Sequence, residues 1–163
     1  MKIDEETIKT WIVDEGIFRE NKVDDDADFH FIVEFPRDNV MDIIKPKGKD
    51  SIIMVCATQV SPQHSELMMN AKQEIKDSFI LKVNMELNRF LIDTQLAINQ
   101  QTGLLQQFVI TDQIFEDGLT KHALFSSLKR VFKAKLQCVW LIDKTFGNIS
   151  HKSEPSNENS MFI

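Results

Sequence analysis

The segment Phe29-His30-Phe31-Ile32-Val33-Glu34-Phe35 places large apolar residues at every second position, and Pro36 follows it. A β-strand points successive side chains to opposite faces of its sheet, so the three phenylalanines and Val33 share one face. His30 points to the other face. The pattern predicts a strand with one buried face that ends at Pro36.

Two more strands are predicted after this one. Residues 40–45 form the second, and the turn-forming residues 46–50 precede a third at residues 51–58. The third strand is apolar at nearly every position, which is typical of a central strand covered on both faces or of a strand at an interface. We therefore expect a three-stranded antiparallel meander.

A short helix is predicted before the strands. Asp4 can cap its N-terminus, and apolar residues recur at helical spacing from Ile8 to Ile12. Gly16 stands where a left-handed C-terminal cap belongs, so the helix is expected to stop just before it. The acidic residues 24–28 are predicted to form a loop.

A long helical region follows the meander. Ser61 can cap it, Pro62 suits the first helical position, and no further Gly or Pro occurs before Gly103. This length is unusual in a compact domain, so we expect either a bent helix or two helices that part near Asp77-Ser78.

Two strands and a last helix complete the predicted order. The first strand begins between Arg89 and Leu96, and the second spans residues 107–115 after a turn at 99–103. The last helix starts at the cap Thr120 and stops at Gly147. The sequence thus predicts one α+β domain over residues 1–147.

Polar residues dominate positions 148–163, which are predicted to be a disordered tail. Only Met161-Phe162-Ile163 is apolar there, and we interpret it as an untethered end rather than a docking element.

The composition narrows the cellular setting. No apolar run approaches the roughly 20 residues of a membrane-spanning helix, and the N-terminus lacks a secretory signal. We therefore expect a cytoplasmic protein that does not bind membranes. The net charge of −6 disfavours nucleic-acid binding, because phosphate neutralisation needs a basic surface.

Motifs for catalysis, cofactors and metals were not found. Residues 24–28 place acids like a calcium loop, but Phe29 stands where that loop needs Gly, which excludes an EF-hand. Cys56 and Cys138 are interpreted as small buried apolar residues. A dyad of Cys56 with His30 on neighbouring strands is an alternative. We predict no catalytic residue, no cofactor and no metal.

Charge is unevenly distributed along the chain. Residues 1–28 carry ten acidic and four basic residues, whereas residues 121–144 carry six basic residues and one acidic residue. Such asymmetry can steer intramolecular docking, dimerisation or the binding of an acidic partner, but a solvated helix face is the simpler interpretation. The residues proposed for an interaction surface are Lys129, Arg130, Lys133, Ile53 and Val55.

The order of elements, together with the run Ile114-Phe115-Glu116-Asp117-Gly118-Leu119-Thr120-Lys121-His122-Ala123-Leu124-Phe125, resembles the fold of type III secretion chaperones and YbjN-like proteins. More closely, residues 3–147 are similar to an uncharacterised prokaryotic family, a domain of unknown function. The resemblance implies a non-enzymatic protein-binding module, often a homodimer, that holds an extended partner segment. The long central helical region departs from the chaperone pattern.

Three functions follow from these observations. The first is a protein-interaction or chaperone-like module, in which a sheet edge accepts a peptide. The second is a small-ligand-binding protein or hydrolase that uses His30, Cys56 or the loop at 24–28. In the third, the basic face of the last helix binds RNA or an acidic protein.

Overall fold

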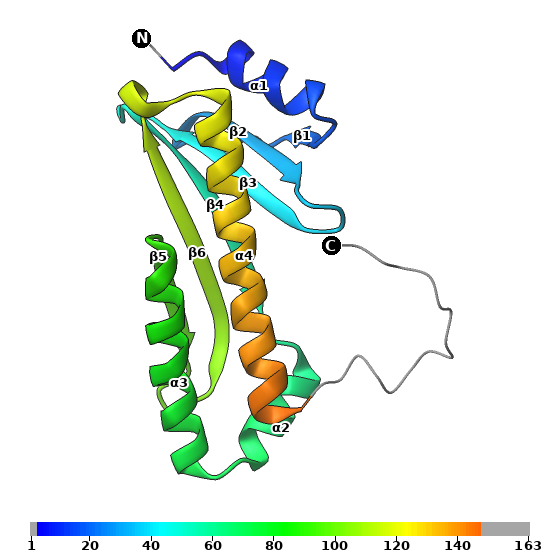
Figure 1. Ribbon diagram of the computed structural model, residues 1–163, viewed down its shortest axis with the longest axis vertical. Coiled ribbons are helices and arrows are strands. Elements are labelled where there is room, and N and C mark those ends of the chain that lie inside the picture. Colours follow the sequence, from blue (N-terminus) through cyan, green and yellow to red (C-terminus); the bar gives the residue numbers. More distant parts are fainter. Residues whose placement is uncertain (1–2, 148–163) are drawn as a thin grey trace, which may run out of the picture.

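Six antiparallel strands form one sheet in the order β1-β2-β3-β4-β6-β5 in the computed structural model, which describes residues 3–147 (Figure 1). The strands are β1 (Phe18–Asn21), β2 (Ala27–Glu34), β3 (Val40–Pro46), β4 (Ser51–Gln59), β5 (Asp93–Ile98) and β6 (Leu105–Phe115). The helices are α1 (Glu5–Asp14), α2 (Pro62–Asn70), α3 (Gln73–Leu87) and α4 (Lys121–Phe146). Short 3-10 turns occupy Asn88–Phe90 and Glu116–Gly118.

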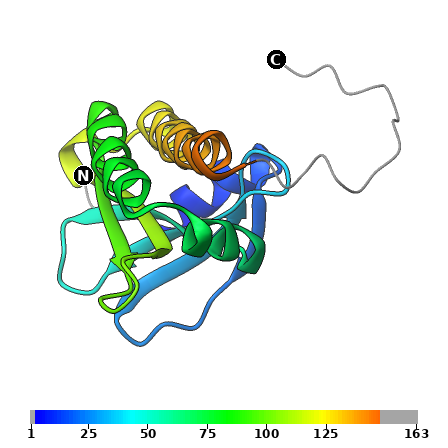
Figure 2. The same cartoon turned by 90° about the horizontal axis from the view of Figure 1, so that it is seen from below.

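Helices α3 and α4 lie together on one face of the sheet (Figure 2). The side chains on that inner face form the core, because every second residue of the central strands is buried there. The opposite, outer face carries half-buried residues such as Ile53 and Val55. None of the described helices is long and apolar enough to cross a bilayer.

The predicted α+β fold is confirmed, with two corrections among the early strands. β1 was not predicted, so the meander has four strands. It has only four residues, three of them exposed, and therefore shows no apolar alternation. The loop predicted at 24–28 ends two residues earlier than expected, since Ala27 and Asp28 already belong to β2.

The central helical region consists of two helices, which confirms one of the two predicted alternatives. The break between them does not lie at the predicted position. The helices part at Ala71-Lys72, where both residues adopt extended backbone with ψ of 153° and 146°, and not at Asp77-Ser78. The helix propensities of Ala71 and Lys72 do not predict a break at this position. Met68 and Phe79 are both buried, and turning the chain between them lets each helix face the core.

The predicted caps are confirmed. The side chains of Asp4, Ser61 and Thr120 accept backbone hydrogen bonds at 3.0, 3.2 and 3.0 Å. Gly16 has a φ of +69° and ends α1, and Gly147 follows α4. The predicted tail at 148–163 lies outside the described residues.

Candidate interaction site

The predicted interaction residues lie on two sides of the sheet. Lys129, Arg130 and Lys133 belong to α4, which packs on the inner face. Ile53 and Val55 alternate with the buried core residues of β4 and therefore point to the outer face. These five residues do not form one surface, because the sheet separates the two groups.

Arg130 has a structural contact within the domain. Its guanidinium lies 3.5 Å from the carboxylate of Asp112, a residue of β6 that is only 9% exposed. The Ser127 hydroxyl donates a 2.7 Å hydrogen bond to the same carboxylate. Lys129 and Lys133 are exposed and have no ion pair within residues 3–147.

The alternative dyad of His30 and Cys56 does not form. His30 points to the outer face and Cys56 belongs to the buried core on the inner face. Burial raises the pKa of Cys56, and burial raises the pKa of Cys138 to about 12, so both thiols stay protonated near neutral pH. This geometry removes the basis for a hydrolase that uses the two residues together.

His30 instead lies between two carboxylates. Its Nδ1 is 2.8 Å from Asp24 and its Nε2 is 3.4 Å from Asp42, and its side chain is 4% exposed. The hydrogen bond from His30 lowers the pKa of Asp24, with a further contribution from the backbone N–H of Asp26. Within residues 3–147, no three His, Cys, Asp or Glu side chains gather as metal ligands.

A second polar chain joins α2 to α4. His64 Nδ1 lies 2.9 Å from the Ser61 hydroxyl, and His64 Nε2 lies 2.9 Å from Asp143. This order resembles a nucleophile relay, but the Ser61 hydroxyl also caps α2 by accepting a hydrogen bond from the His64 N–H. The contacts from Ser61 through His64 to Asp143 hold α2 against α4.

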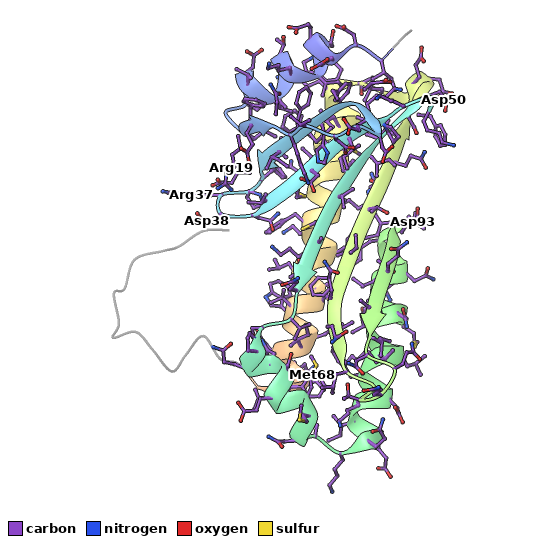
Figure 3. The ribbon with its side chains drawn as sticks, turned by 180° about the vertical axis from the view of Figure 1, so that it is seen from behind. Arg19, Arg37, Asp38, Asp50, Met68 and Asp93 are labelled. Atoms are coloured by element: carbon purple, nitrogen blue, oxygen red, sulfur yellow. The ribbon has the colours of Figure 1, made fainter. Side chains whose placement is uncertain are left out.

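Helix α3 and strand β5 lie along the same border of the molecule (Figure 3), and we call the exposed residues there, with the outer edge of β5, the α3–β5 surface. Leu81 and Met85 lie one turn apart on α3 and are 62% and 61% exposed, and Leu91, just before β5, is 85% exposed. β5 pairs only with β6, so its other edge is free within the described residues. The sequence analysis predicted no site on this surface, although Leu81 and Met85, two apolar residues one helical turn apart, could have indicated it.

Three solved structures are similar to this chain. An uncharacterized protein from Methanothermobacter thermautotrophicus is 44% identical, with a TM-score of 0.84 over 89% of this chain and 100% of its own. YbjN from E. coli has a TM-score of 0.48 at 13% identity, over 85% of this chain and 92% of its own. The ExsC–ExsE complex has a TM-score of 0.51 at 13% identity, over 86% of this chain and 97% of its own. A likeness at this low identity shows the fold alone.

Comparison with curated proteins found no match. The family model DUF2299, described as an uncharacterized conserved protein, matches residues 4–142. The resemblance found in the sequence is therefore confirmed, and the chain belongs to the DUF2299 family of uncharacterized conserved proteins.

Proposed function

We propose that this chain is a non-enzymatic protein-interaction module that works as a homodimer through the α3–β5 surface. The observation that carries the proposal is that Leu81 and Met85 on α3 are large apolar side chains, more than half exposed. The outer edge of β5 is also free within the described residues. Burying such a side chain stabilises a complex by roughly 1.5–3 kcal/mol. Clustered exposed apolar residues mark interaction sites.

A second copy of the chain suits this surface. A two-fold axis brings the same patch from each protomer together, and it makes two β5 strands pair antiparallel. Such pairing satisfies the free backbone groups of both edges. Figure 3 shows β5, which starts at Asp93, and α3 along the same border of the molecule.

The opposite sheet edge is less suited to pairing. β1 has four residues and an irregularity in its register between Phe18 and Glu20. Short and bulged edge strands resist the addition of another strand. The proposal therefore assigns dimerisation to β5.

One comparison supports a role in binding proteins, and the cysteines bear on the compartment. The fold is shared with ExsC, which was solved as a complex with ExsE. Cys56 and Cys138 are free and buried, which fits a reducing compartment, and we place the protein in the cytoplasm.

Light scattering on the purified chain tests the dimer. We expect a mass of twice 18.9 kDa for the wild type and 18.9 kDa for Leu81→Asp/Met85→Asp, because two carboxylates cannot be buried at the interface. Met69→Asp is the matched control, since Met69 on α2 is 60% exposed and lies outside the surface. It should stay dimeric. A monomeric wild type, or a double variant that remains dimeric with an unchanged circular dichroism spectrum, would refute the proposal.

A further inference from the structure

A hollow of about 470 Å³ lies where the α1–β1 connection, the end of β2 and the first turns of α4 meet. Its floor is apolar and is made by Ile17, Phe35 and Phe125. Lys121, His122 and Lys129 lie around it. Glu15 also lines it and forms a 2.6 Å ion pair with Lys121. The volume falls in the range of pockets that bind ligands.

A second hollow of about 320 Å³ adjoins the first, and both are lined by Ile17 and Phe35. Arg19 and Arg37 lie beside it. Figure 3 shows these two arginines, from β1 and from the β2–β3 turn, at the same corner of the sheet. Ile17 and Phe35 line both hollows, and we call the two hollows together the basic groove.

The walls of the basic groove are held in place by contacts that need no ligand. The Phe35 and Phe125 rings meet edge to face at 6.2 Å between centroids. The Ile17 carbonyl accepts a 2.9 Å hydrogen bond from the Glu34 N–H, and the Asn39 carbonyl accepts one of 2.8 Å from the Phe35 N–H. A preformed groove loses little conformational entropy when it is filled.

The groove is basic although the chain is acidic. Four cations line it, Lys121, Lys129, Arg19 and Arg37, against the carboxylates of Glu15 and Glu34. In the part of the chain that the structure describes, only Lys121 of these cations has an ion-pair partner. The net charge of the whole chain is −6, so the groove is a local exception.

We propose that the basic groove binds an acidic peptide segment of a partner protein, with one large apolar side chain on the floor and carboxylates beside Lys129 and the two arginines. Charge complementarity favours an anion, and the apolar floor favours a side chain over a bare phosphate chain. RNA fits less well, because its affinity rests on many phosphate contacts and the rest of the chain repels them. The inference rests on the proposed role as a protein-interaction module but not on the dimer.

Titration with three synthetic octapeptides tests the groove. The first has one Phe flanked by Glu residues, the second replaces Phe by Ser, and the third replaces Glu by Lys. We expect only the first to bind, with amide chemical-shift changes centred on Ile17, Phe35 and Phe125. Affinity should fall between 50 and about 300 mM salt, because added ions screen exposed charges.

Charge reversal locates the site. Lys129→Glu/Arg37→Glu should weaken binding of the first peptide by about tenfold, since two attractive contacts become repulsive. Lys133→Glu is the matched control, because Lys133 is exposed on the next turn of α4 but does not line the groove. It should change affinity less than twofold.

Several outcomes would overturn the inference. One is that Lys129→Glu/Arg37→Glu binds the first peptide as tightly as the wild type does, and another is that the Ser peptide binds as tightly as the Phe peptide. Chemical-shift changes centred on other residues, or tighter binding of an oligo(U) RNA of equal charge, would also overturn it. Concentration-dependent association of the wild type that Lys129→Glu/Arg37→Glu abolishes would show that a second copy is the occupant. Light scattering on the same samples separates this result from failure of the α3–β5 dimer, since Leu81→Asp/Met85→Asp should bind the peptide normally.

Discussion

At the scale of single residues, the buried His30 makes the stability of the sheet depend on acidity. The hydrogen bond from His30 lowers the pKa of Asp24 below its usual 3.8 in the folded protein. The charged carboxylate is therefore favoured by folding. This contribution is present above the unfolded pKa and is lost as the pH falls through the lower folded pKa.

We therefore expect Asp24→Asn to destabilise the protein at pH 6–7, with a difference from the wild type that shrinks below about pH 4. Urea unfolding at a series of pH values from about 7 to 2.5 measures it. Asp25→Asn is the control, because the Asp25 side chain has no hydrogen bond or ion pair in the described region. A difference between Asp24→Asn and wild type that stays constant down to the lowest pH would contradict the linkage.

At the scale of elements, a buried carboxylate attaches α4 to the sheet. The Asp112 carboxylate on β6 accepts a 2.7 Å hydrogen bond from the Ser127 hydroxyl, and the Arg130 guanidinium lies 3.5 Å from the same carboxylate. Removing the hydroxyl leaves a buried carboxylate oxygen with one partner fewer. We expect Ser127→Ala to lower the free energy of unfolding by about 1–3 kcal/mol.

Chemical denaturation measures this loss, and the neighbouring Ser126→Ala is its control. The Ser126 hydroxyl is 3.3 Å from His122 at the surface, so the change should stay within about 0.5 kcal/mol. In a double-mutant cycle, Asp112→Asn and Ser127→Ala should cost less together than the sum of the two single changes. Additive costs would show that the two side chains do not act as a pair.

The same elements show how far local patterns reach. Caps could be predicted because each depends on a few neighbouring residues, as Ser61-Pro62 and Thr120 illustrate. The break at Ala71-Lys72 could not, since it depends on burying Met68 and Phe79 in one core. β1 gave no signal, because an edge strand with exposed residues needs no apolar alternation.

At the scale of the whole molecule, the interaction surfaces depend on elements that are distant in the sequence. Lys129 was predicted as an interaction residue. Phe35 and Ile17 line the same hollow but come from other elements, so the sequence could not group them with Lys129. Ile53 and Val55 were grouped with it on apolar character, and the sheet places them on the opposite face. Charge and burial patterns identify surface residues, whereas only tertiary contacts say which of them share a surface.

The stability of the molecule is expected to come from the described domain. The packed core extends from Ile3 to Phe146, and the Gly147 N–H bonds to the Asp143 carbonyl at 2.9 Å. A chain truncated after residue 148 should therefore unfold within about 1 °C of the full chain in calorimetry. Truncation after residue 144 is the matched comparison, because it removes Phe146, whose ring meets Phe79 at 4.9 Å. That loss should lower the midpoint by roughly 2–4 °C for each kcal/mol of lost burial. A large drop for the first truncation would show that residues 149–163 contribute to folding, and the domain boundary at 147 would be wrong.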